Sequence, residues 1–218
     1  MSRQPIAVIT GMASEARLLR GLDLMAISTG GDPDATKHGV EAMIREGAER
    51  LISFGIAGAL DPLLKPGDLI LAAAVHLPDG HRQSVDQKWL VHIAQALPHA
   101  RIADVAGSST IVATAAAKAT LQRDSGAVCV DQESHWVAKI ADANRVPFIV
   151  VRAIADRAGD SLPPAVLVGL DEEGRPRTGA VIAALLRDPS QIGGLIRVAF
   201  QTRRALKTLL RSRAALTV

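Results

Sequence analysis

The chain has 218 residues and a net charge of +3, and 48% of its residues are hydrophobic. This length favours one α/β domain over residues 1–218. The lack of Tyr, with only three Phe and two Trp, argues against a nucleic-acid binder that stacks on bases. Cys129 is the single cysteine, so no disulfide framework is expected. The N-terminus carries no signal-like stretch, and no apolar run approaches the roughly 18 residues that span a bilayer, so we expect a cytoplasmic protein.

Short apolar runs alternate with helical patterns along the chain, which is typical of βα units. The expected strands are Ile6–Ile9, Leu24–Ser28, Leu51–Phe54, Asp68–Val75, Arg101–Ala106, Ala127–Val130 and Phe148–Asp156. The expected helices are Ala13–Arg20, one from Pro33 to about Gly47, Val85–Ala96, Thr114–Arg123, one starting near Glu133, and two C-terminal helices separated by Pro189. This order predicts a three-layer α/β/α fold with a mixed, mostly parallel central sheet.

Three carboxylates, Glu15, Glu133 and Asp156, each follow closely on an apolar run that reads as a buried strand. Ligand sites of open α/β sheets gather beyond the carboxyl ends of the strands, and acids at one such edge suit proton transfer. Each acid also has a local alternative. Glu15 and Glu133 could cap a helix, worth about 0.3–1 kcal/mol, and Asp156 could pair with Arg152 or Arg157.

Other sequence features give weak or negative evidence for a ligand site. Gly55-Ile56-Ala57-Gly58 follows the third expected strand, where small residues let a ligand approach the backbone, although an ordinary strand-to-loop turn is an alternative. His76 and His81 lack the spacing and companions of a metal site, so no metal is expected. The glycines near Glu15 do not form the G-x-G-x-x-G fingerprint, so no dinucleotide is expected either.

Four motifs taken together resemble the nucleoside phosphorylase family. They are Gly11-x-x-x-Glu15, Gly55-x-Ala57-Gly58 with Gly67-Asp68, Asp131-x-Glu133, and Arg152-Ala153-Ile154-x-Asp156. The chain most resembles the nucleosidase branch, which cleaves methylthioadenosine and adenosylhomocysteine. Within that branch it is most similar to the hopanoid-associated phosphorylases, which are thought to remove adenine from adenosylhopane. The resemblance extends from about Ile6 to Asp160.

The resemblance implies a role for each acid. Asp156 would protonate the purine at N7, Glu133 would hold the ribose hydroxyls, and Glu15 would orient the nucleophile. The residues expected to bind substrate are Gly55, Ile56, Ala57, Gly58, Gln132, Ala155 and Ile111. No metal or organic cofactor is implied, but inorganic phosphate stays open as a co-substrate in place of water, and we favour hydrolysis. A homo-oligomer is expected, as is common in the family.

The chain departs from the pattern of the nucleosidases at three of these positions. Ile56 and Ala155 stand where Ser is common, and Gln132 stands where Met is common. No aromatic residue near Ile111 would stack on the base. These changes predict a refitted pocket and argue against simple methylthioadenosine as the substrate. We expect an adenine nucleoside with a bulky 5′ substituent. The alternatives are a phosphate-dependent purine nucleoside phosphorylase and a non-catalytic protein that binds nucleosides or lipids.

The C-terminal segment is strongly basic. From Arg187 onward, Asp188 is the single acid against Arg187, Arg197, Arg203, Arg204, Lys207, Arg211 and Arg213. One interpretation is a docked amphipathic helix that buries Ile192, Leu195, Ala199, Leu206 and Leu209. The other is that the basic strip, with the apolar patch Ala165–Leu170, rests on an anionic membrane surface. The substrate would then be a lipid-linked purine nucleoside.

Overall fold

The structure is a computed structural model that describes residues 4–167, 183–184 and 186–217. The strands are β1 Ile6–Thr10, β2 Met25–Ser28, β3 Arg50–Ala59, β4 Leu69–His76, β5 Arg82–Ser84, β6 Arg101–Gly107, β7 Cys129–Asp131 and β8 Phe148–Asp156. The helices are α1 Ala13–Leu18, α2 Pro33–Arg45, α3 Gln87–Ala96, α4 Ala115–Ser125, α5 Ser134–Asn144, α6 Pro164–Leu167 and α8 Ile192–Ser212, with short 3₁₀ helices η1 Pro189–Gln191 and η2 Arg213–Thr217. The predicted α/β fold is confirmed, and the short β5 is the strand that the sequence pattern missed.

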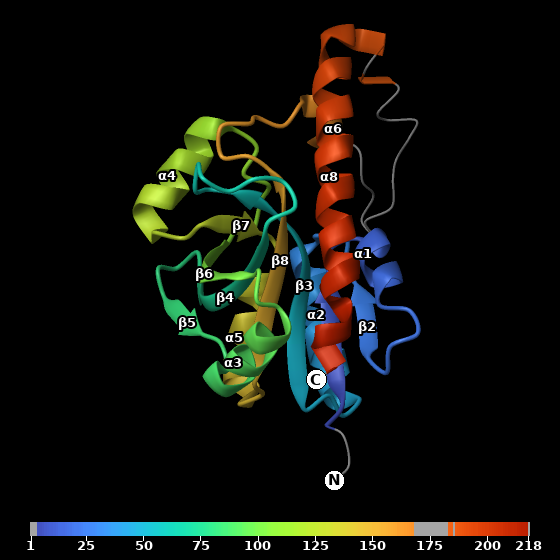
Figure 1. Cartoon of the computed structure of the whole chain (residues 1–218), viewed down its shortest axis with the longest axis vertical. Coiled ribbons are helices and arrows are strands. Elements are labelled where there is room, and N and C mark those ends of the chain that lie inside the picture. Colours follow the sequence, from blue (N-terminus) through green and yellow to red (C-terminus); the bar gives the residue numbers. More distant parts are fainter. Residues whose placement is uncertain (1–3, 168–182, 185, 218) are drawn as a thin grey trace.

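The strands form one mixed sheet that closes partly on itself (Figure 1). Its order is β2-β1-β3-β7-β6-β4-β5, and β8 pairs in parallel with β3 and antiparallel with β4. The strands β3, β7, β6, β4 and β8 therefore make a closed ring, and β1 and β2 extend from β3 as an open edge. Most pairings are parallel, as predicted. The antiparallel ones are β3–β7, β4–β5 and β4–β8.

Helices cover both faces of this sheet. Every residue of β1 and β8 is buried, and strands buried on both faces require a helical layer on each side. On one side α2 packs against α5, and on the other α8 packs against α1, β3 and β8. Figure 1 shows α8 running in front of these strands. The core between the layers is aliphatic apart from a few aromatic side chains, such as Phe54 and Phe148.

Polar caps set where the helices begin. The side chains of Asp32, Asp86 and Thr114 accept hydrogen bonds from the backbone N–H groups three residues ahead, at the starts of α2, α3 and α4. Such a cap contributes about 1 kcal/mol. Gly126, with a φ of 71°, ends α4 in the left-handed conformation that glycine adopts without strain. The predicted helix boundaries therefore hold to within a few residues.

The segment Gly55–Gly58 is part of a strand rather than a strand-to-loop turn. β3 continues through it to Ala59, because β8 runs alongside and pairs with β3 from Leu51 to Gly58. A register shift between Ala57 and Gly58 marks an irregularity, after which β3 pairs antiparallel with β7. The consequence is that the backbone of this motif is held rigidly beside the ends of β7 and β8.

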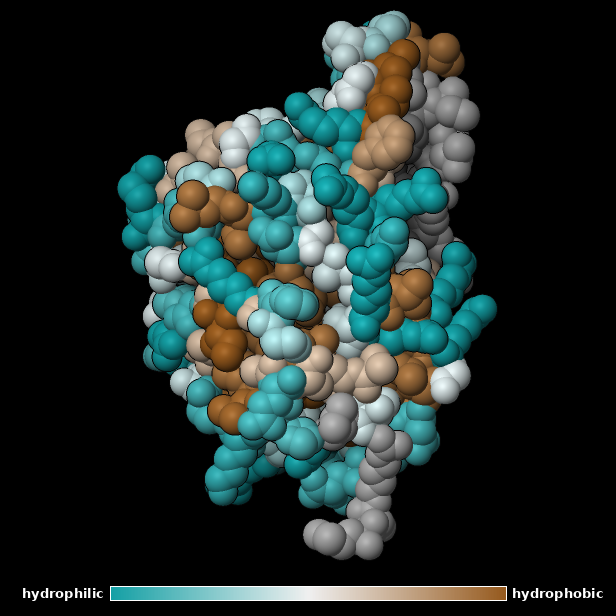
Figure 2. All heavy atoms as spheres, in the orientation of Figure 1, coloured by the Kyte–Doolittle hydropathy of each residue, from teal (hydrophilic) through white to brown (hydrophobic). Residues whose placement is uncertain are grey.

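The long helix α8 has a docked face and an exposed face. Ala205 and Leu209 are fully buried, whereas Ile192, Ile196 and Phe200 are 46%, 53% and 65% exposed. The prediction that Ile192 and Ala199 are docked is therefore wrong, because both are exposed. Figure 2 shows hydrophobic side chains along the upper part of α8 and hydrophilic ones along its lower part.

The apolar patch predicted at Ala165–Leu170 lies only partly within the structure. Its first residue, Ala165, is buried and so does not face solvent, and residues 168–170 lie outside the described residues. Among the helices that the structure describes, none is both long and apolar enough to cross a membrane.

Candidate active site

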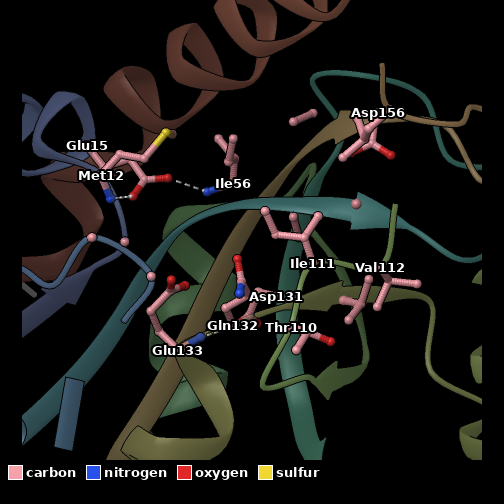
Figure 3. A pocket seen from close by; sticks show the side chains of 18 residues that line it. Met12, Glu15, Ile56, Thr110, Ile111, Val112, Asp131, Gln132, Glu133 and Asp156 are labelled. Atoms are coloured by element: carbon pink, nitrogen blue, oxygen red, sulfur yellow. Dashed lines mark hydrogen bonds between the residues drawn. The ribbon is translucent and has the colours of Figure 1, made fainter. Parts of the chain in front are cut away.

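A cavity of about 190 Å³ lies at the carboxyl ends of β1, β7 and β8, beside the end of β3 (Figure 3). Glu15, Glu133 and Asp156 all line it, and we call it the carboxylate cavity. Figure 3 shows Glu15 and Glu133 toward one end of this cavity and Asp156 at the other. The structure thus brings the three predicted acids together from α1, α5 and β8.

The residues predicted to bind substrate reach this cavity with one exception. Those that line it are Ile56, Ala57, Gly58, Ile111, Gln132 and Ala155. Gly55 does not line it, because the Glu15 side chain lies over this glycine. Thr110 and Val112 join Ile111 in the wall, so this side of the cavity is aliphatic rather than aromatic.

Glu15 is held by two backbone N–H groups. Its Oε2 accepts a hydrogen bond of 2.8 Å from Met12 N, and its Oε1 accepts one of 2.8 Å from Ile56 N. The first bond caps α1, so the predicted capping role and a place in the cavity coexist in one side chain. Burial raises the pKa of Glu15 above its ordinary value, and the two hydrogen bonds oppose that rise.

Glu133 stands at the start of α5 but does not cap it. Asp131 does so instead, because its Oδ1 accepts hydrogen bonds from Glu133 N at 2.8 Å and from Ser134 N at 2.7 Å. The capping alternative for Glu133 is therefore wrong, and its carboxyl is free to face the cavity. Burial, together with the charge of Asp131 and a smaller effect of Glu15, raises the pKa of Glu133 to about 8.

Arg152 is a buried cation behind the end of the cavity where Glu133 lies. Its Nε lies 3.0 Å from Asp131 Oδ2, and both side chains are 1% exposed. A second guanidinium nitrogen lies 3.6 Å from Glu133 Oε2. Burial raises the pKa of Asp131, but the charge of Arg152 and hydrogen bonds outweigh it, and the pKa is lowered overall.

The ion partner of Asp156 is Lys118 of α4 rather than Arg152 or Arg157. Arg152 precedes Asp156 by four residues on β8, about 13 Å along an extended strand, which puts it out of reach. Burial raises the pKa of Asp156, and the adjacent ammonium of Lys118 opposes the rise. Sequence reasoning missed Lys118, which stands among alanines on a helix with little amphipathic pattern, 38 residues before its partner.

Each acid rests against a glycine. A Cβ atom would lie 2.8 Å from Glu15 Oε1 if built on Gly55, and 3.2 Å from Asp156 Oδ1 if built on Gly58. On Gly11 it would lie 2.5 Å from an oxygen of the Glu133 carboxyl. Gly55 and Gly58 lie on either side of the register shift in β3, so this one strand contacts acids at both ends of the cavity.

A second, larger cavity of about 540 Å³ adjoins the first, and we call it the α8 cavity. The two share the wall residues Met12, Ile56, Ala155, Asp156 and Leu162. The remaining wall of the α8 cavity consists of Ala165, Val166, Leu195, Val198, Ala199, Thr202, Arg203 and Leu206. Ile56 and Ala155, the two positions where the sequence departs from the expected serines, therefore stand where the two cavities meet.

The lining of the carboxylate cavity contains acids but no Lys, Arg or His among the described residues. Both cations, Arg152 and Lys118, lie behind the acids. Such a cavity suits a reaction that develops positive charge next to the carboxylates and takes a proton from an acid at the opposite end. Within the described part of the chain, no three His, Cys, Asp or Glu side chains gather as metal ligands would.

One sequence relative has a named activity. The chain is 27% identical over 157 residues to the aminodeoxyfutalosine nucleosidase of Campylobacter jejuni. This alignment covers 63% of this chain and 69% of that protein.

Solved structures with the same fold include two enzymes of related names. The 5′-methylthioadenosine/S-adenosylhomocysteine nucleosidase of Neisseria meningitidis, bound to methylthio-immucillin-A, has a TM-score of 0.76 at 17% identity over 98% of both chains. The futalosine hydrolase of Helicobacter pylori has a TM-score of 0.75 at 14% identity, over 98% of this chain and 97% of that one.

A family model described as the phosphorylase superfamily matches residues 27–187, which is more than half of the chain. The matched range contains Glu133 and Asp156, and Glu15 precedes it. The chain belongs to the phosphorylase superfamily.

Proposed function

We propose that this protein hydrolyses the N-glycosidic bond of an adenine nucleoside that carries a bulky apolar group at its 5′ position, and releases adenine. The substrate that fits the proposal best is adenosylhopane, in hopanoid lipid biosynthesis. One observation carries the proposal: the buried acids Glu15, Asp131, Glu133 and Asp156 line one cavity, and this cavity shares a wall with a larger apolar one. The nucleosidase and hydrolase names of the similar proteins agree with this reaction class.

The reaction divides among the three acids. Asp156 gives a proton to N7 of the purine while the bond between C1′ and N9 breaks and its electron pair goes to the base. Positive charge then develops on the sugar and favours the ionised form of Glu133, which stabilises that charge and holds the ribose hydroxyls. Glu15 orients a water molecule that attacks C1′ and accepts the proton that this water loses. Glu15 then releases the proton to solvent, and Asp156 takes up a proton from solvent for the next cycle.

Water suits this cavity better than phosphate does. A phosphorylase binds an anion, usually through Arg or other cationic donors, and the described lining of the carboxylate cavity offers none. The two carboxyl groups of Glu15 and Glu133 stand at the end where the nucleophile would enter. A phosphate dianion would find no cation to pair with there, whereas a neutral water molecule can donate a hydrogen bond to Glu15.

The apolar 5′ group would occupy the α8 cavity. With a volume of about 540 Å³, this cavity lies within the roughly 300–1,000 Å³ that is typical of small-molecule sites. Ile56 and Ala155 provide apolar contacts at its entrance from the carboxylate cavity. Burial of a long hydrocarbon substituent in this cavity would favour binding by about 25 cal/mol per Å² of apolar surface removed from water.

A lipid-linked substrate must be collected from a membrane, and the exposed face of α8 is suited to that. Its first half exposes Ile192, Ile196 and Phe200, and its second half carries Arg204 and Lys207 on the same side. We propose that this face contacts an anionic lipid surface. Sedimentation with phosphatidylglycerol vesicles, but not with phosphatidylcholine vesicles, is the expected result, and equal recovery in both supernatants would contradict it.

The catalytic proposal is tested by incubating the full chain with adenosylhopane, methylthioadenosine or inosine, with and without phosphate, and following base release by chromatography. We expect phosphate-independent release of adenine, fastest from adenosylhopane. A sugar 1-phosphate that forms only with phosphate present would show a phosphorylase instead. Failure to release base from any adenine nucleoside would overturn the enzymatic proposal and favour a binding protein.

A further inference from the structure

We propose that Lys118 is a positioning residue that orients the catalytic acid Asp156 and makes it a stronger acid. The inference rests on the proposed function, because it assumes that Asp156 donates the proton to the leaving base. Lys118 itself would touch neither the base nor the sugar, since it does not line the carboxylate cavity. It would act entirely through the carboxyl group beside it.

The hydrogen bonds of the Lys118 ammonium are all accounted for within the protein. It donates to Asp156 Oδ2, and at 2.9 Å each to the carbonyl oxygens of Arg157 and Asp160. An ammonium group has three donors, so none is left for a substrate. Because Lys118 holds Oδ2 and the Gly58 backbone lies against Oδ1, the carboxyl is fixed from both sides.

The burial of Lys118 is unusual for its helix. Among the residues of α4, all of which are described, Lys118 alone is buried, and its side chain is 1% exposed. Taking an ammonium group out of water costs several kcal/mol, which an apolar residue at this position would avoid. A lysine in this place therefore points to a use for its charge.

Anchoring the loop after β8 does not by itself require this lysine. Leu162 N donates to Ala113 O at 2.8 Å, and Ala115 N donates to Ser161 Oγ at 3.2 Å. These two bonds already tie the loop to the start of α4 without any charge. What they do not supply is a cation next to Asp156.

The other charges near Asp156 act in the opposite direction or at longer range. Asp160 raises the pKa of Asp156, and its own carboxylate is held from α8 by Gln201 at 2.9 Å, with Arg197 3.9 Å away. Glu15 and Glu133 stand at the far end of the cavity. Among the described residues, Lys118 is thus the one cation in direct contact with the acid.

The charge of Lys118 matters most after the proton has left. Neutral Asp156 becomes a carboxylate when it protonates N7, and the adjacent ammonium stabilises that product. Proton transfer to the base is then more favourable than from a carboxyl group that is merely buried. The cost is that Asp156 loses its proton to solvent at a lower pH than it otherwise would.

The experiment compares Lys118→Met with Lys118→Arg by measuring kcat/KM for adenine release across pH. Loss of the positive charge should raise the pKa of Asp156, so the alkaline limb of the Lys118→Met profile should move up by about 1–3 pH units. Below the alkaline limb, where Asp156 is protonated in both proteins, kcat/KM of Lys118→Met should fall roughly 10- to 100-fold, a part of what a positioned acid contributes. Lys118→Arg keeps the charge and should leave the limb near its original position.

A second substrate separates this role from a structural one. A 4-nitrophenyl riboside with the same 5′ group needs no proton on its leaving group, so Lys118→Met should hydrolyse it at close to the wild-type rate. Equal losses on both substrates, with an unmoved alkaline limb, would overturn the proposal and leave Lys118 as a structural tie. If Lys118→Met is too unstable to assay, Lys118→Gln replaces it. Adenine release by the wild-type protein tests the proposed function separately.

Discussion

The two adjoining cavities share a wall but are built in different ways. The carboxylate cavity is formed by strand ends, and its acids rest against the backbone of Gly11, Gly55 and Gly58. The α8 cavity has a volume of about 540 Å³ against about 190 Å³, and six of its thirteen wall residues come from one helix, α8. If the proposed function holds, bond cleavage and substrate choice belong to separate parts of the fold. Substitutions at the strand ends should slow the reaction of every substrate, and substitutions on α8 should discriminate among substrates.

The largest effect is expected from Asp156→Asn. An amide does not donate the proton that the leaving base needs, so kcat should fall by about 10²–10⁴-fold for long and short 5′ groups alike. Steady-state adenine release measures it. Because the Asn oxygen still accepts a hydrogen bond from Lys118, the melting temperature serves as the folding control. A loss confined to one substrate would break the division between the two cavities.

A smaller and selective effect is expected from Leu195→Trp, which would fill part of the α8 cavity. Displacing a long apolar group from this cavity forfeits about 1.5–3 kcal/mol of burial, so KM for such a nucleoside should rise roughly 10- to 100-fold. KM for a nucleoside with an unmodified 5′ hydroxyl should change little. Val91→Trp is the control, since Val91 is 57% exposed on α3, away from the exposed face of α8, and lies outside both cavities.

The smallest expected effect is on protein stability, and it concerns Glu133 in the carboxylate cavity. The pKa of Glu133 is raised from 4.5 to about 8, so between these values the folded chain binds more protons than the unfolded chain. Stability contributed at this site is therefore present below pH 4.5 and is lost as pH rises toward 8.

Glu133→Gln removes that dependence. The melting temperature of the variant, relative to wild type, should therefore be several degrees higher at pH 8 than at pH 5. Scanning calorimetry at the two pH values measures it, and Glu46→Gln, at an exposed position of the same residue type, is the control. A pH-independent difference between wild type and Glu133→Gln would show that Glu133 titrates normally.

Much of the fold was predictable because its signals are local. Apolar runs such as that of β8 mark strands, and a carboxylate after such a run, as at Asp156, marks the edge where sites gather. The pairings behind the acids were not predictable in this way. Asp131 caps α5 in place of Glu133, and Lys118 reaches Asp156 from a helix far away in sequence. Neither pairing leaves a periodic pattern, because each depends on how distant segments meet.

The prediction of a turn at Gly55–Gly58 was wrong for a related reason. Two glycines in four residues read as a turn when only neighbours are considered. In the fold, β8 pairs with this segment and keeps it extended. Local propensity was overridden by a strand that comes about a hundred residues later in the chain.

The contacts that hold the acids have a consequence for redesign. Glu15 is held by the backbone N–H groups of Met12 and Ile56, and Asp156 is held by Lys118 from behind the cavity, so no side chain of α8 is needed to hold either acid. The α8 wall could therefore be randomised, for example at Leu195, without displacing the groups that break the bond. If the proposed function holds, variants that accept new 5′ substituents can be selected from libraries in which only residues of α8 are varied.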